Sequence, residues 1–260
     1  MIIDFHAHIY PNKIAEKASH AIGAFYNAPM SYNGSPEALI ASGKRINVTK
    51  YVVHSAATSA SQVESINNFI IEQASNHSEF IGFGTMHVDY ENSSQELERI
   101  KNAGLKGIKL HPDFQKFPID CEKMNPIYEK LIELGLICLV HAGDKRFDFS
   151  GPQHFKNVID RYPDLVMIAA HFGGYTEWDK SYEILAGQKI YFDTSSSLWT
   201  LPVEKANAFI KKHGADRFVW GSDFPMWDHK EELERFNKLG LSNSDKEKIL
   251  YSNAAKLLGL

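Results

Sequence analysis

Short, continuous apolar runs recur along the chain and alternate with longer stretches whose apolar residues have helical spacing. A run without polar alternation is typical of a strand in a parallel sheet that is covered on both faces. Apolar residues at every third or fourth position between the runs indicate amphipathic helices. The predicted strands lie at residues 1–5, 51–54, 80–86, 107–111, 136–140, 165–170, 190–193 and 218–220.

Polar residues mark where several of the helices begin. Ser35 precedes Pro36, which is the usual order of an N-cap and a first helical residue. Three further helices open with the pattern Ser-x-x-Glu of a capping box, at Ser61, Ser93 and Ser244. The stretch 10–34 is long for a strand-to-helix connection, and we expect a short lid with some helix around residues 13–24.

Eight strand–helix units in 260 residues have the size and order of a (β/α)8 TIM barrel. We therefore expect an α/β chain whose single domain spans residues 1–260, with a short insert after the first strand and extra helices at the C-terminus. A doubly wound open sheet is the structural alternative. No G-x-G-x-x-G follows the first strand and no Walker loop is present, so nothing favours a nucleotide-binding fold.

Composition excludes several classes of partner. Charged residues make up 23% of the chain and the net charge is -4, which indicates neither nucleic-acid nor membrane-surface binding. No apolar run approaches the length of a membrane span, and no leader precedes the first strand. Cys121 and Cys138 form no C-x-x-C motif, which favours free thiols in a reducing compartment. We expect a cytoplasmic protein.

Histidines gather at the ends of the predicted strands. His6 and His8 point to the same face of the first strand because side chains alternate along a strand. A single H-x-H is more often a surface or core pair than a metal site. In a barrel, however, all the carboxyl ends of the strands meet at one mouth. Seven of the 12 histidines lie at or just past such ends: His6, His8, His54, His87, His111, His141 and His171.

The remaining five histidines fall in predicted helices or loops, and we expect them to be solvated. For any single histidine at a strand end, a satisfied polar residue remains the simpler interpretation. Seven at one rim indicate a shared site. The five expected to be solvated are His20, His77, His154, His213 and His229.

Three positions complete a candidate metal site with the H-x-H. His141, His171 and Asp223 end the fifth, sixth and eighth predicted strands. Imidazole nitrogen and carboxylate oxygen suit Zn²⁺ or another borderline divalent ion. His171, whose ordinary pKa is near neutrality, would then be able to relay a proton.

These segments are similar to those of a known family. The chain resembles the amidohydrolase superfamily and, within it, the amidohydrolase-related branch that includes aminocarboxymuconate-semialdehyde decarboxylase. The resemblance extends from residue 1 to the C-terminus. Its segments are Asp4-Phe-His-Ala-His8, Gly107-Ile-Lys-Leu-His-Pro112, Val140-His-Ala-Gly143, Ala170-His-Phe-Gly-Gly174, Trp220-Gly-Ser-Asp-Phe-Pro225 and Asn253-Ala-Ala-Lys-Leu-Leu-Gly259.

The resemblance implies a (β/α)8 barrel with a bound divalent metal, usually zinc. Carried onto this chain, it makes His6, His8, His141 and Asp223 the ligands, with His171 beside the reactive water as a base or orienting group. Asp223 is the second catalytic candidate, because a carboxylate near the metal can accept a proton and pass it to a leaving group.

Lys109 shares a strand face with His111 and is expected to point into the barrel. A buried unpaired charge is costly, so this lysine needs a partner. It either pairs with Asp4 or Asp223, binds a substrate carboxylate, or is carboxylated and bridges two metal ions as in some members of the superfamily. We favour one ion. His111 is either a substrate contact or a hydrogen-bond partner of the following loop.

Aromatic and basic residues in the predicted loops at the mouth suit a small, flat, carboxylate-bearing substrate, with Trp199 as a contact; the alternative is that they only pack the lid. The other loop residues in this group are Phe25, Tyr26, Lys145, Arg146, Phe147 and Trp227.

Three functions follow from the sequence. The first is a metal-dependent hydrolase of a small amide, ester or lactone. The second is a metal-dependent decarboxylase of a small unsaturated or aromatic acid, which the short chain makes less favoured. The third, a non-catalytic barrel, predicts a missing ligand, and none is missing. A small-molecule substrate is the expected partner, and the barrel class also admits a homodimer.

Overall fold

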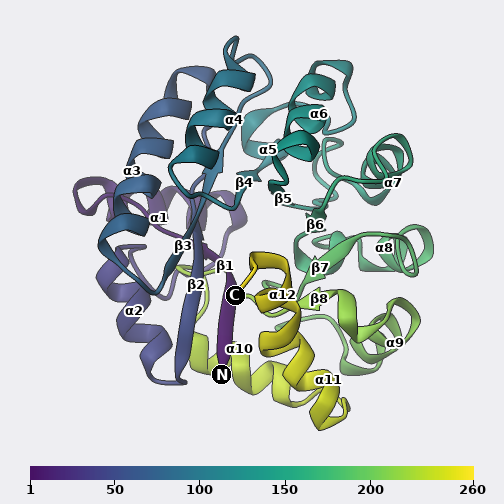
Figure 1. The fold of residues 1–260 in the computed structure, drawn as a ribbon. Helices are drawn as coiled ribbons and strands as arrows, with labels where there is room; N and C mark the ends of the chain where they lie inside the picture. The colour runs from purple at the N-terminus through teal and green to yellow at the C-terminus, as the bar shows by residue number, and fades with distance from the viewer.

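Eight parallel strands form a barrel in the computed structural model, which describes all 260 residues (Figure 1). Each strand pairs with the next one along the chain. The ring closes where the Phe5 N–H donates to the Trp220 carbonyl at 2.9 Å and Ala7 bridges Phe224. This confirms the TIM barrel over the open sheet. The strands are β1 Ile2–His8, β2 Val48–His54, β3 Phe80–Thr85, β4 Gly107–Leu110, β5 Ile137–Val140, β6 Met167–Ala169, β7 Tyr191–Asp193 and β8 Phe218–Val219.

Helices surround the strands and follow them in alternation (Figure 1). The insert after β1 contains a helix, α1, which confirms the helix predicted around residues 13–24 and extends it by one residue at its start and two at its end. None of the helices is both long and apolar enough to cross a bilayer. The helices are α1 Asn12–Tyr26, α2 Pro36–Lys44, α3 Val63–Asn76, α4 Ser93–Asn102, α5 Pro112–Gln115, α6 Asn125–Leu134, α7 Pro152–Arg161, α8 Trp178–Ile184, α9 Val203–His213, α10 His229–Asn237, α11 Asn243–Glu247 and α12 Asn253–Leu258, with short turns η1 Ala60–Gln62, η2 Glu122–Met124, η3 His171–Gly173, η4 Ala215–Arg217 and η5 Lys248–Ser252.

The predicted caps are partly right. Ser35 caps α2, because its hydroxyl accepts a backbone N–H of the first turn. The capping boxes are wrong. The cap of α11 is Ser242 rather than Ser244, and its hydroxyl accepts the N–H of Asp245 at 3.1 Å. The Ser-x-x-Glu pattern at Ser244 therefore does not mark the cap, which lies two residues earlier. The other two proposed caps, Ser61 and Ser93, accept no backbone N–H.

The core has two layers, as a barrel requires. Side chains that point inward, such as Phe5, Phe83 and Leu139, fill the barrel itself. Ala254 and Leu258 of α12 pack against this inner cluster, and Figure 1 shows α12 beside β1. A second, larger cluster fills the space between strands and helices. With the inner cluster closed by α12, the polar side chains at the carboxyl ends of the strands face the other end of the barrel.

Candidate metal centre

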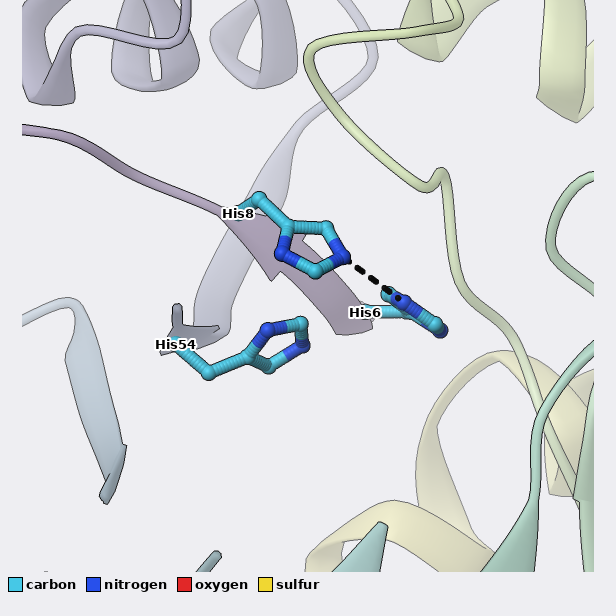
Figure 2. A group of neighbouring side chains, drawn as sticks. All are labelled: His6, His8 and His54. Carbon is cyan, nitrogen blue, oxygen red and sulfur yellow. Dashed lines mark hydrogen bonds between the residues drawn. The ribbon is translucent and has the colours of Figure 1, made fainter. Parts of the chain in front are cut away.

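Three acceptor atoms from β1 and the segment after β8 form a compact triangle. His6 Nε2 lies 3.3 Å from His8 Nε2, and these atoms lie 3.4 and 3.6 Å from Asp223 Oδ1. Tetrahedral zinc with bonds of about 2.0–2.1 Å separates its ligand atoms by about 3.3–3.4 Å. The triangle therefore fits one face of a tetrahedral ion, and Figure 2 shows a ring nitrogen of His8 next to one of His6.

Asp193 determines which nitrogen of His6 carries the proton. Its Oδ2 lies 2.7 Å from His6 Nδ1, and a carboxylate only accepts hydrogen bonds. His6 must therefore donate from Nδ1, and its Nε2 keeps a lone pair that faces His8 and Asp223. A carboxylate behind a metal-ligating histidine commonly sets the tautomer and the ring orientation in this way.

Two more nitrogen lone pairs, one on His141 and one on His171, face each other after the ends of β5 and β6. His171 Nδ1 donates to the carbonyl of Ser195 at 3.1 Å, and His141 Nε2 donates to the carbonyl of Gly143 at 3.0 Å. The remaining nitrogens, His141 Nδ1 and His171 Nε2, lie 3.0 Å apart. Because the ring proton of each histidine is donated to a carbonyl, the two facing nitrogens have only lone pairs. A cation between or beside them would relieve that repulsion. Because the ring of His171 also stacks on that of His6, with centroids 5.1 Å apart, the two groups of donors are continuous.

Most of these imidazoles are held neutral. Burial lowers the pKa of His8 and of His171 to about 3, and it also lowers the pKa of His6 well below the usual value. Neutral imidazole is the form that binds metal ions. Burial therefore opposes protonation of His171, and its proposed part in proton relay stays a prediction. At neutral pH, His171 is an uncharged ring with a lone pair.

Lys109 is fully buried inside the barrel, with its Nζ 3.1 Å from His6 Nε2. It makes no ion pair with Asp223. Asp4 does not pair with it either, because Asp4 is held by His229 at 2.9 Å and by Ser222. The salt bridge, which was one of three alternatives for Lys109, is therefore not formed in this structure. Burial lowers the pKa of Lys109 to about 8, against the attraction of Asp193 and Asp223.

The backbone is strained at two of the candidate residues. His171 has φ of 60° and Asp223 has φ of 56°, and neither is glycine. Such left-handed conformations cost energy and concentrate at functional sites. The Ser196 hydroxyl donates to Asp223 Oδ2. Ser196 also has a left-handed backbone, with φ of 45°.

Trp199 supports the loop of Ser196 and lies outside the cavity described below. Its indole N–H donates to the Ser196 carbonyl at 3.1 Å, and the indole N–H of Trp227 donates to the Ser196 hydroxyl at 2.9 Å. The two indoles stack with centroids 5.7 Å apart. Both tryptophans therefore act on Asp223 through Ser196, a link that sequence could not reveal.

A cavity of about 840 Å³ opens from these donors. Phe25 and Tyr26 of the insert line it, as predicted for the mouth, whereas Lys109 and the loop residue Arg146 do not. Arg146 instead pairs with Asp144. The candidate site residues that line the cavity are His8, His111, His141, His171 and Asp223.

His111 lies between two rings, stacked on Phe114 and His141 with centroids 3.8 and 4.0 Å apart. Its Nε2 lies 2.9 Å from the hydroxyl of Tyr26, so it ties the insert to the barrel. Asp113 lies behind the neighbouring ring, with its Oδ2 3.3 Å from His141 Nε2.

Two kinds of residue were missed or misplaced by sequence reasoning. Asp193 and Asp113 were given no role, although Asp193 ends an apolar strand in the same way as the histidines do. His213 and His229 were expected to be solvated and are buried: His213 accepts the N–H of Gly187 at 3.0 Å, and His229 binds Asp4. A helical position does not distinguish a surface face from one that packs on the barrel.

Among known proteins, a dihydroorotase from Marinomonas sp. (strain MWYL1) is 26% identical over 108 residues, which cover 36% of this chain. The match spans about a third of that relative's length, 31%. A dihydroxybenzoic acid decarboxylase from Polaromonas sp. JS666, solved with manganese and the inhibitor 2-nitroresorcinol, is 17% identical. It has a TM-score of 0.77 and covers 100% of this chain and 97% of its own.

A probable 2-pyrone-4,6-dicarboxylic acid hydrolase from Acinetobacter baumannii, solved with citric acid, is 18% identical. It has a TM-score of 0.73 and covers 100% of this chain and 99% of its own. At such identities these structures show a common fold. The family model described as Amidohydrolase matches residues 3–260, and this chain therefore belongs to the amidohydrolase family of enzymes.

Proposed function

We propose that this enzyme is a metal-dependent hydrolase of a small amide, ester or lactone. The observation that carries the proposal is the triangle of His6 Nε2, His8 Nε2 and Asp223 Oδ1, whose edges of 3.3 to 3.6 Å fit a tetrahedral ion. His141 is the fourth proposed ligand, through the lone pair on its Nδ1. A divalent ion bound there would polarise a substrate carbonyl and lower the pKa of a water molecule.

The side chains around the ion have distinct tasks. Asp223 faces the cavity and is 14% exposed, so it is placed to take a proton from water and pass it to the leaving group. The Ser196 hydroxyl holds the other oxygen of Asp223. His171 lines the same cavity, and its Nδ1–H is fixed by Ser195, so Nε2 is the atom available to orient a water or a carbonyl.

The donors form two sets, which bears on the number of ions. His6, His8 and Asp223 form one, and His141 with His171 forms the other. We propose a single ion, because the first set already has three donor atoms spaced for one ion, whereas the second set offers only two. A carboxylated Lys109 would instead join the two sets and hold two ions. Zinc suits the donor atoms, and manganese is the ion named for the Polaromonas decarboxylase.

Decarboxylation is the second candidate, because structures of the same fold include both the Polaromonas decarboxylase and the Acinetobacter hydrolase. The decarboxylase aligns over 97% of its chain, so the short chain no longer argues against this reaction. The cavity favours hydrolysis of an uncharged substrate. Lys13 is the one lysine or arginine that lines it, and Lys13 lies at the exposed start of α1.

Metal analysis and a substrate screen test the proposal together. The enzyme is purified from medium with zinc and manganese, its metal content is measured, and it is assayed on esters, lactones, amides and carboxylated aromatics. We expect about one ion per chain and hydrolysis that Asp223→Asn removes. Asp179→Asn, an exposed carboxylate paired with Lys205, is the matched control. Release of CO₂ without hydrolysis would establish the decarboxylase, and full activity in Asp223→Asn would overturn both.

A further inference from the structure

The helix α1 buries its small side chains against the protein and leaves its large apolar side chains Ile14 and Ile22 partly exposed. Its buried residues are the small ones, Ala15, Ser19 and Gly23, which form one stripe against the protein. Its large apolar residues are on another face. Ile14 is 43% exposed, and Ile22 is only partly buried. A surface helix normally buries its large apolar residues, so this face lacks a partner within the chain.

The cavity borders this unpartnered face. Five apolar residues, which we call the apolar arm, line it: Ile14, Ala18 and Ile22 of α1, and Ile66 and Phe69 of α3. The metal-site residues His8 and Asp223 line the same cavity, so the arm is continuous with the proposed reaction centre. A volume of about 840 Å³ lies in the range of pockets that enclose drug-sized ligands, which is far more than a single ring requires.

The charges in the cavity are distributed unevenly. Its metal end has imidazoles and one carboxylate, while the charged residues along the helices, Lys13 and Glu72, are both exposed. Apart from Lys13 and Glu72, the lining residues of α1 and α3 have no charge with which to bind a second carboxylate, and Ser65 and Asn68 are polar members of the α3 side. An uncharged chain would gain from burial there, whereas an anionic group would lose hydration without a partner.

We propose that the substrate carries an apolar chain of several carbons, which lies between α1 and α3 while the hydrolysable carbonyl reaches His8 and Asp223. This assignment rests on the proposed hydrolysis and names its substrate class as an acyl or alkyl-substituted ester, amide or lactone. Each buried methylene would raise kcat/KM by up to about fourfold, until the chain reaches the exposed end of the arm.

A chain-length series tests the proposal. We expect kcat/KM for p-nitrophenyl esters to rise from acetate through butyrate and hexanoate to octanoate. Ala18→Phe, which fills the arm, should collapse the octanoate-to-acetate ratio. Ala24→Phe makes the same change at an exposed position of α1 outside the cavity lining, and it should keep the ratio of the unmodified enzyme.

A binding measurement separates this proposal from the proposed reaction. Octanamide and acetamide are titrated by calorimetry into the Asp223→Asn enzyme, with and without Ala18→Phe, because the proposed hydrolysis needs Asp223 and the amides are then not turned over. Tight octanamide binding that Ala18→Phe abolishes supports the apolar arm even if no ester is hydrolysed, and the failure then concerns hydrolysis alone. Equal rates across the ester series, or octanamide binding that Ala18→Phe leaves unchanged, would overturn the apolar arm.

A second, independent observation concerns His54 at the end of β2. The side chain is fully buried, and neither ring nitrogen has a hydrogen-bond partner. A neutral imidazole has one donor and one acceptor, and leaving both unpaired in the interior is costly. His54 faces the two histidines of β1 (Figure 2), and one ligand atom from each of His6, His8 and His54 lies within 4.8 Å of the others.

We infer that His54 is a further ligand of the ion proposed to bind His6 and His8, so that this ion would have more than four protein ligands. His54→Leu replaces the unpaired ring with an apolar side chain. We expect the variant without metal to be as stable as the unmodified protein or more so, and to bind Co²⁺ and Zn²⁺ at least 10- to 100-fold more weakly in competition with a chelator. The visible spectrum of bound Co²⁺ should also change, because it reports the ligand set.

The control is His87→Leu, because His87 is another buried histidine beyond a strand end, and its Nδ1 accepts the N–H of Asp89. This variant should keep the metal affinity and the Co²⁺ spectrum. If His54→Leu does not fold, His54→Gln is measured in its place. A folded His54 variant with unchanged metal affinity and an unchanged Co²⁺ spectrum would refute the inference.

Discussion

Asp193→Asn should weaken metal binding without any change in the proposed ligands. Asp193 Oδ1 accepts the N–H of His171 at 2.9 Å, the N–H of Ser195 at 3.0 Å and the Ser195 hydroxyl at 2.6 Å. Asparagine has one carbonyl oxygen, and these three donors would hold that oxygen in the position of Asp193 Oδ1. The amide NH₂ would then face His6 Nδ1, where Asp193 Oδ2 now accepts at 2.7 Å.

Two facing donors repel, so His6 would change to its other tautomer. The proton would move to Nε2 and remove the lone pair proposed to bind the ion. Loss of such a supporting carboxylate typically weakens metal affinity by about 10- to 100-fold, or about 1.4–2.7 kcal/mol. The loss should be larger than any change in the stability of the metal-free protein.

The assay is competition for Zn²⁺ between the metal-free enzyme and a chromophoric chelator at pH 7.5 or similar neutral conditions. Circular dichroism and urea unfolding verify that the variant folds. Asp179→Asn, at an exposed carboxylate, should bind zinc as the unmodified enzyme does. A folded Asp193→Asn variant with zinc affinity within about twofold of the unmodified enzyme would refute the tautomer argument.

Three further changes have defined outcomes. Burial lowers the pKa of His213 to about 4, so its contribution to stability is complete above pH 6.5 and is lost as the pH falls toward 4. The other buried histidines also destabilise the protein at low pH, so the prediction is a difference: the stability lost between pH 7 and pH 5 in urea unfolding should be about 2 kcal/mol smaller in His213→Gln than in the unmodified protein. Asn67→Ala should cost about 2–4 kcal/mol in the same assay, because it leaves the buried N–H of Thr85 and the carboxylate of Glu96 without this partner; an effect below about 1 kcal/mol would contradict the argument. Lys109→Met should keep one ion, with equal or tighter binding, since the amine that now donates to His6 Nε2 is gone; a fall from two ions to one by elemental analysis would instead show a carboxylated lysine.

The barrel could be predicted because its evidence is local. Each strand is a run such as 136–140, and each is followed by a helical stripe, so the order of elements is visible without tertiary contacts. The cap at Ser35 was predictable for the same reason. The cap at Ser242 was missed, because two serines near a helix start have similar local signals and only the backbone decides between them.

The sequence predicted which candidate ligands come together, but it did not predict the hydrogen bonds that orient them. Histidines at strand ends meet in any parallel barrel, so His6, His8 and Asp223 could be grouped in advance. Asp193 could not, since its role is a hydrogen bond to a ring nitrogen 187 residues away in sequence. Tautomers depend on such contacts, and they decide which lone pairs face the ion.

The sequence alone determined the fold class, the family and the positions of the histidines at the strand ends, because periodicity and motifs are properties of the chain read in order. The tertiary structure alone decided the role of α1. Its sequence is amphipathic in the ordinary sense, yet the helix packs on its small residues and leaves Ile14 and Ile22 to the cavity. Which face of a helix is buried depends on the shape of what it packs against, and no local pattern contains that shape.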